Sequence, residues 1–286
     1  MAAEPGSLVG FALLVLATPD AFDKAALTRR ALAAWRTGAL PAWLPCDGAA
    51  ADKPARDASL TVVQPGAAPK RGRGGTPESR RALLHALAHT ESWAVDLSWD
   101  IVARFARQLP AGCDTRAFCD DWAVVAEDEA AHFELLAARL AEVGGRFGEL
   151  PVHDGLWESA ARTAHSLAAR LAVEHCVHEA RGLDVLPQTI ARFRAGGDEA
   201  SAALLESRIL PEEVSHCAKG VAWFRRLHEA LHPGGGEAAA AAAFRQAVAD
   251  NFRGALKPPF NEAARAAAGF SPDWYLAQPA AAPVAC

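Results

Sequence analysis

One pattern of glutamate and histidine residues occurs twice along this chain and constrains its fold more than any other feature. In each copy a lone glutamate is followed by a Glu-x-x-His pair, 38 residues later in the first copy and 34 in the second. Residues three apart on an α-helix share one face, so each pair would present both side chains in one direction. Four helices that turn four carboxylates and two imidazoles inward provide the ligands of a two-metal site. The predicted ligands are Glu91, Glu129, His132, Glu179, Glu213 and His216.

The repetition is what supports this prediction, because a single Glu-x-x-His pair arises easily by chance in a helical chain rich in Glu and Ala. The chain itself contains a third pair of this spacing, Glu229 and His232. That pair lies beside a glycine run and has no matching glutamate upstream, so we expect it to play no part in metal binding. A helical bundle whose acids are merely solvated is the alternative, and it leaves the repeated interval unexplained.

Composition favours a helical, cytoplasmic protein. Apolar residues make up 51% of the chain and alanine is abundant, which suits helices around a sizeable core. The net charge of −5 gives no electrostatic reason to bind nucleic acid or an anionic membrane. The six cysteines lack C-x-x-C or zinc-binding spacing and are typical of reduced thiols. The apolar run from Leu8 to Ala17 is too short to span a bilayer and has no basic leader, so we expect a packed helix and no membrane segment.

We expect an all-α chain in three parts. Residues 1–75 would form two short helices and an extended Pro-rich arm, residues 76–233 a four-helix bundle with the two-metal site, and residues 234–286 a C-terminal helix and tail that pack on the bundle. The long helices are predicted at roughly 77–108, 115–144, 155–195 and 198–232.

Three positions predict irregularities in the long helices. The third helix contains Gly182 and Pro187, and we expect a break near one of them. In the fourth helix Pro211 lies shortly before Glu213, which indicates a kink or another local irregularity beside the metal ligands.

Several other polar residues compete with the predicted ligands or support them. Asp96 lies about 140° around its helix from Glu91, so both cannot reach one metal, and Glu91 is preferred because its interval matches the second copy. His175, one turn before Glu179, either joins the site or is a hydrogen-bonded core histidine. Histidine ligands usually donate their other N–H to a carboxylate or a carbonyl. The residues predicted to support the ligands in this way are Asp96, His175, Asp184 and Glu212, with Glu127, Asp128 and Asp100 as further acids that are equally compatible with solvated charges.

Short blocks of the sequence also carry a resemblance. The most specific are His153-Asp-Gly-Leu-Trp157 and Glu179-Ala-Arg-Gly-Leu-Asp184; the others are Leu84-His-Ala-Leu-Ala-His-Thr-Glu91, Asp128-Glu-Ala-Ala-His-Phe133 and Lys257-Pro-Pro-Phe-Asn261. They resemble, over nearly the whole chain, an uncharacterised bacterial ferritin-like family known mostly as a domain of unknown function. Its fourth-helix block usually reads Asp-Glu-Ile-x-His-Val, and Glu212-Glu-Val-Ser-His-Cys217 keeps the ligand positions. The resemblance implies a ferritin-like four-helix bundle with a metal site. More distantly the chain resembles ferritin-like diiron oxygenases, including the bacterial hydroxylase that acts on modified tRNA.

The site and the resemblance together predict a non-haem diiron oxidoreductase that uses O₂ as co-substrate, of the hydroxylase, desaturase or N-oxygenase type. Two Fe ions are the expected cofactor, with Fe/Mn and Mn/Mn pairs open because carboxylate-rich sites accept manganese. We expect a small-molecule substrate, an external electron donor and no membrane; a homodimer is open. One alternative is a ferroxidase or peroxidase like ferritin or rubrerythrin, and another is a tRNA-modifying hydroxylase, although nucleic acid is not the expected partner. A structural bundle with a vestigial site is a third alternative, and the complete ligand set argues against it.

Overall fold

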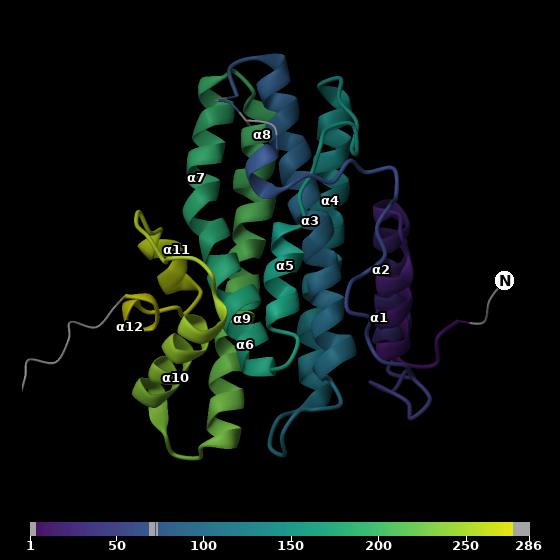
Figure 1. Cartoon of the computed structure of the whole chain (residues 1–286), viewed down its shortest axis with the longest axis vertical. Helices are drawn as coiled ribbons and strands as arrows, with labels where there is room; N and C mark the ends of the chain where they lie inside the picture. Colours follow the sequence, from purple (N-terminus) through teal and green to yellow (C-terminus); the bar gives the residue numbers. More distant parts are fainter. Residues whose placement is uncertain (1–3, 69–71, 73, 277–286) are drawn as a thin grey trace, which may run out of the picture.

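The computed structural model describes residues 4–68, 72 and 74–276, and this part of the chain is all-α, as the sequence predicts (Figure 1). Within these residues the β-type pairing is limited to an isolated parallel bridge between Val62 and Val152. None of the helices in the described ranges is long and apolar enough to cross a membrane.

The chain begins with two antiparallel helices that lie along one side of the molecule. They are α1 (Leu8–Ala17) and α2 (Ala21–Arg36), and the Asp20 side chain accepts hydrogen bonds from the first backbone N–H groups of α2. This pair packs against α3 (Pro77–Phe105) and α4 (Thr115–Glu142) (Figure 1). The apolar run that forms α1 is therefore a packed helix, as expected. In the described part of the segment between α2 and α3, the helical structure is limited to a short 3₁₀ turn, η1 (Pro65–Ala67), and the rest is irregular.

The third predicted helix is divided, but at a different place from the one expected. A short helix, α5 (Gly155–Arg162), is followed by a turn. A continuous rod then comprises α6 (Leu167–Ala172), a π-helical segment η2 (Val173–His178) and α7 (Glu179–Ala195). The expected break near Gly182 or Pro187 is wrong, since α7 runs through both positions.

The C-terminal tail explains why Pro187 does not break α7. Proline has no N–H to donate to the carbonyl four residues earlier, which here belongs to Leu183. The side-chain amide of Asn261 donates a hydrogen bond to that carbonyl at 3.1 Å. A residue far along the sequence thus replaces the missing helical hydrogen bond.

The fourth long helix is irregular where the sequence predicts. It comprises α8 (Glu199–Leu204), a π-helical segment η3 (Leu205–Ile209) and α9 (Leu210–Leu231). The π-helical segment ends just before Pro211, where the wider turn relieves the clash between the proline ring and the preceding carbonyl.

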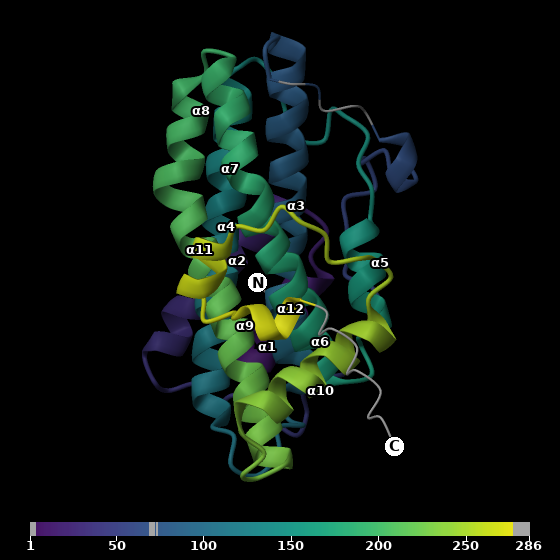
Figure 2. The ribbon, with the colours of Figure 1, turned by 90° about the vertical axis from the view of Figure 1, so that its left-hand side faces the viewer.

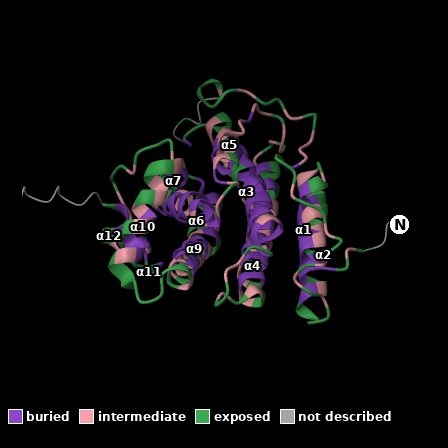
Figure 3. Ribbon diagram, turned by 60° about the horizontal axis from the view of Figure 1, so that its bottom comes forward, coloured by how far each residue is buried: buried purple, intermediate pink, exposed green. Residues whose placement is uncertain are grey.

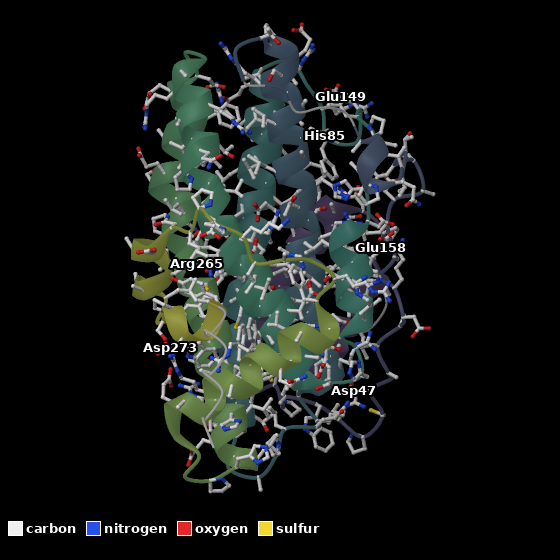
Figure 4. The ribbon with its side chains drawn as sticks, turned by 60° about the vertical axis from the view of Figure 1, so that its left-hand side comes forward. Asp47, His85, Glu149, Glu158, Arg265 and Asp273 are labelled. Atoms are coloured by element: carbon white, nitrogen blue, oxygen red, sulfur yellow. The ribbon has the colours of Figure 1, made fainter. Side chains whose placement is uncertain are left out.

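Three helices near the C-terminus cover the lower part of the bundle, in the orientation of Figure 2. They are α10 (Gly236–Asn251), α11 (Glu262–Ala267) and α12 (Pro272–Tyr275). Arg265 of α11, labelled in Figure 4, forms a two-pronged ion pair with Asp184 of α7, at 2.6 and 2.9 Å. This ion pair fixes the tail to the bundle. Figure 3 shows that much of α3, α4, α6 and α9 is buried.

Candidate metal centre

The four long helices bring all six predicted ligands to one buried place in the middle of the bundle. Two of these helices each supply a lone glutamate, Glu91 from α3 and Glu179 at the start of α7. The other two, α4 and α9, each supply a Glu-x-x-His pair from one helical face. All but Glu179 are buried, and Glu179 is half-buried.

The ligands form two groups that share two carboxylates. Within each group one donor atom per residue lies within 4.8 Å of all the others. Glu129 and Glu213 belong to both groups, so each carboxylate is placed to bridge two ions. Glu91 and His132 complete the first group, and Glu179 and His216 complete the second.

Both imidazoles direct Nδ1 toward the shared carboxylates. His132 Nδ1 lies 3.4 Å from Glu213 Oε1 and 3.5 Å from Glu129 Oε2, and His216 Nδ1 lies 3.0 Å from Glu129 Oε1. Yet both Nδ1 atoms and Glu129 Oε2 are buried without a hydrogen-bond partner among the described residues. Buried polar atoms are seldom left without a partner, and divalent cations between these donors would provide one. The residues therefore fit a pair of metal ions.

The outer nitrogen of each imidazole is held by an acid from the other copy of the motif. His132 Nε2 lies 2.7 Å from Glu212 Oε2, and His216 Nε2 lies 3.2 Å from Asp128 Oδ2. Glu212 directly precedes Glu213, and Asp128 directly precedes Glu129. If the outer N–H donates to this acid, Nδ1 is left free for a metal, as is usual for histidine ligands. The contact predicted for Glu212 is thus present, and Asp128, which the sequence left open, makes the same contact.

The other predicted supporting acids have different partners. Asp96 is fully buried and pairs with Lys24 of α2 and, at 2.8 Å, with Arg56 of the arm. Asp184 pairs with Arg265 and accepts the backbone N–H of Asn261. We therefore correct the assignment of both acids: they fasten the N-terminal and C-terminal segments to the bundle rather than orient histidine ligands.

His175 is a core histidine and belongs to neither ligand group. Its ring packs on Trp122 with a centroid separation of 4.2 Å. Burial, reinforced by the positive charge of Arg170, lowers the pKa of His175 well below its usual value, so the ring is neutral. Among the described residues its Nε2 has no hydrogen-bond partner, so the prediction of a hydrogen-bonded core histidine is wrong for this nitrogen.

When no cation is bound, protons would balance the negative charges of the clustered carboxylates. Burial, and the repulsion of Glu129 and Glu213 respectively, raise the pKa of Glu91 and of Glu179 well above the usual range. Burial opposes ionisation of both imidazoles, but the surrounding carboxylates outweigh it and raise the pKa of His132 and His216. For Glu129, burial is likewise outweighed by the two imidazoles, and its pKa is lowered. Binding of divalent cations would therefore displace protons from this site.

A cavity of about 270 Å³ opens onto the ligands between α3 and α7. Four ligand carboxylates, those of Glu91, Glu129, Glu179 and Glu213, form part of its lining. Most of the remaining lining is apolar, with leucines from α3 and α7 and Leu156 from α5. The cavity lies where a molecule inside it would be beside the metal ions.

Two further polar residues in the cavity were not foreseen from the sequence. Glu174 is buried, and in the part of the chain that the structure describes neither of its carboxyl oxygens has a hydrogen-bond partner. His178 lies 3.7 Å from Glu174 and contacts the Ser159 hydroxyl at 3.1 Å. Glu174 precedes Glu179 by five residues, a spacing that an ordinary α-helix places on different faces. A π-helix bonds residue i to i+5, so η2 brings the two glutamates toward one side of the rod.

Comparison with known proteins places the chain in a family without assigning it a function. The chain is 37% identical over 167 residues to an uncharacterised protein of Haemophilus influenzae, a match that covers 58% of this chain and 57% of that protein. The match thus spans little more than half of the relative's length. No solved structure matches the chain. A family model described as "protein of unknown function (DUF455)" matches residues 17–276. As the sequence blocks indicate, the chain therefore belongs to this family of proteins of unknown function.

Proposed function

We propose that the chain is a non-haem dimetal oxidoreductase, with two Fe ions as its cofactor, that uses O₂ to oxidise a small organic molecule. The observation that carries this proposal is the pair of ligand groups with two shared carboxylates, open on one side to a mostly apolar cavity. The ferritin-like resemblance in the sequence belongs to this proposal and supports it.

The donor set suits iron or manganese. Each ion would take one imidazole nitrogen and otherwise carboxylate oxygens, with Glu129 and Glu213 shared. Oxygen-rich sites with a single imidazole favour iron or manganese over metals that prefer thiolates or several nitrogens. When bound, a reduced pair of such ions supplies the electrons with which O₂ is activated.

The residues of the chain would prepare the cavity for that reaction. Apolar side chains exclude water and hold the substrate beside Glu91 and Glu213. Burial raises the pKa of Glu174 to about 7, so near neutral pH this carboxyl can either give a proton to a molecule in the cavity or take one from it.

The cavity also favours oxidation of a small molecule over the alternatives. A ferroxidase needs only a route for ions, and apolar walls serve no purpose there. A tRNA hydroxylase needs an open basic cleft, whereas the space beside the ligands is largely apolar and confined between two helices. The external electron donor, the cytoplasmic location and a homodimer remain predictions from the sequence.

The test combines metal content with oxygen uptake. Reconstituted protein is expected to hold about two iron ions per chain, and the reduced protein is expected to consume O₂, with uptake coupled to product only when an organic substrate is present. Glu229→Ala is the matched control, because Glu229 accepts the backbone N–H of Gly234 at the end of α9, outside the ligand groups. Oxidation of added Fe(II) over many cycles, with ferric mineral as the product, would instead establish the ferroxidase alternative.

A further inference from the structure

We propose that the cavity beside the ligands binds an organic anion with an apolar body, with its anionic group at Arg192, at the end of α7 farther from the ligands, and its body running along α7 toward Gly182 and the ligands, while Arg181 adds positive charge beside that path. This inference rests on the proposed function of the same site and specifies its substrate class.

The cavity walls fit an apolar body of limited size. Leucine side chains from α3 (Leu83, Leu87) face Val185 and Leu186 of α7 across the space. The start of α3 lies beside the end of α7, as the hydrogen bond from Arg80 to the Gly196 carbonyl shows, so the two walls run antiparallel. An apolar cavity of about 150 Å³ is known to hold a benzene ring, so about 270 Å³ accommodates a somewhat larger apolar body, such as a chain of about eight carbons.

Two arginines on the rim have no counter-ion. Arg181 and Arg192 are exposed and line the cavity, and within the described part of the chain neither guanidinium has a hydrogen-bond or ion-pair partner. By contrast, Arg194 on the same helix is paired with Glu199 and Glu206. Eleven residues separate the two rim arginines, which is close to three full helical turns, so both lie on one side of α7 about 16 Å apart.

The rim therefore carries positive charge although the chain as a whole is acidic. Lys257 lies with Arg181 along an adjoining hollow, and the acid of that hollow, Asp184, is already paired with Arg265. Unpaired guanidinium groups bind carboxylates and phosphates through charge-assisted hydrogen bonds. The chemistry that matches this rim is an anionic head group.

Gly182 leaves open the part of the cavity that is nearest to a shared ligand. It lies inside α7 with an ordinary backbone conformation, where alanine would be more favourable by roughly 1 kcal/mol. A Cβ atom at this position would meet, within 4 Å, only Glu213 Oε2, at 3.7 Å, which is an ordinary contact. At Gly220 of α9, by contrast, a Cβ atom would lie 1.8 Å from the His175 carbonyl oxygen. Gly220 is thus required by helix packing, whereas Gly182 is explained by the space it leaves beside Glu213.

The experiment measures binding without any reaction. The full chain is loaded with Mn(II) in anaerobic buffer and titrated by calorimetry with octanoate, 1-octanol and octylammonium. Octanoate is expected to bind at least about tenfold more tightly than the other two, and the double variant Arg181→Gln/Arg192→Gln is expected to remove that preference while changing octanol binding less than about twofold. Arg194→Gln, on the same helix, should leave all three affinities unchanged. Equal binding of octanoate and octanol by the wild type, or an unchanged preference in the double variant, would overturn the proposal.

A second pair of variants tests the path of the apolar body. Gly182→Leu and, from the opposite wall, Leu87→Phe are expected to weaken octanoate and octanol together by about tenfold or more while metal content stays at the wild-type level. If either variant fails to fold, the other decides, and retained octanoate affinity in a folded variant contradicts the proposed path. Because no oxygen is present, a negative result here leaves the proposed oxidoreductase function untouched, and a lack of oxygen uptake leaves the binding result untouched.

Discussion

The six predicted ligand residues differ in how many ions each one would serve. Glu129 and Glu213 are shared by both groups, whereas Glu91 and Glu179 each belong to one. Removing a shared carboxylate therefore damages both metal positions, and removing a terminal one damages a single position.

The first prediction follows from that difference. Glu129→Ala and Glu213→Ala should each lower the metal content of reconstituted protein from about two ions per chain to near zero, while Glu91→Ala and Glu179→Ala should retain about one. Elemental analysis after reconstitution gives the answer, with Glu229→Ala as the control. Equal losses in the shared and terminal variants would contradict the assignment of bridging ligands.

Glu174 makes folding stability depend on pH. Burial raises its pKa to about 7 in the folded protein, against the positive charge of Arg170 and Arg162, with the Ser159 hydroxyl also nearby and Asp100 adding to the rise. The unfolded value is lower, so the folded state binds more protons between about pH 4.5 and pH 7. The stability contributed by the neutral carboxyl is complete below this window and is lost as the pH rises through it.

The second prediction is that Glu174→Gln removes the loss of folding stability that accompanies a rise in pH. Between pH 4.5 and a pH above 7, the free energy of unfolding of the variant relative to the wild type should rise by about 3 kcal/mol. Urea unfolding at several pH values measures the difference. Glu158→Gln, an exposed position on α5, serves as the matched control. A constant difference between Glu174→Gln and the wild type across the window would show that the Glu174 carboxyl does not ionise there.

At the scale of helices, two glycines in the long rods have opposite roles. At Gly220 an added methyl group would overlap the backbone of η2, and a backbone cannot rotate away as a side chain can. At Gly182 the same methyl group would make only an ordinary contact.

The third prediction compares these positions. Gly220→Ala should destabilise the fold by about 3 kcal/mol or more, because α9 must move away from η2. Gly182→Ala should stabilise the protein by about 0.5–1 kcal/mol, because alanine loses less backbone entropy in a helix. Chemical unfolding of both variants checks the signs, and a loss of stability in Gly182→Ala would mean that this position is crowded.

The helical period decided how much of the site could be predicted. The spacing of Glu129 and His132 places both side chains on one face of any regular α-helix. The structure accordingly brings together all six residues that the sequence singles out. Glu174 was missed because a π-helical segment changes the period just before Glu179. No local sequence feature predicts this π-helical segment.

Contacts between distant parts of the chain account for the remaining differences. The helix continues past Pro187 because Asn261 bonds the Leu183 carbonyl, and Asp184 is occupied by Arg265. Asp96 is likewise occupied by groups from the N-terminal segment. Sequence reasoning treats such acids as available to any neighbour, since their partners are fixed only by the tertiary fold.

At the scale of the whole molecule, binding of metal at the proposed site would be coupled to folding. The site draws ligands from four helices that are separated along the sequence, so the unfolded chain offers no such arrangement. Ions that bind only the folded state stabilise it by mass action.

The fourth prediction is that chelation destabilises the protein. At metal concentrations about a thousandfold above the dissociation constant the stabilisation is about 4 kcal/mol, which corresponds to roughly 10 °C in melting temperature. The effect should shrink on acidification, because the imidazoles of His132 and His216 have raised pKa values and must lose their protons to bind metal. Differential scanning calorimetry of metal-loaded and chelated protein measures the shift. A melting temperature that does not respond to metal would argue against tight binding at this site.

Each imidazole contacts an acid from the other copy of the motif, and these contacts constrain how the sequence can evolve. Each imidazole is oriented by an acid from the other copy of the motif, across 80 residues for His132 and 88 for His216. Neither copy therefore holds a complete set of ligands and orienting groups. An altered Asp128 impairs the histidine of the second copy, and an altered Glu212 impairs that of the first. If the site binds metal as proposed, substitutions in one copy would affect the other, and neither copy alone would carry a complete set of ligands and orienting groups.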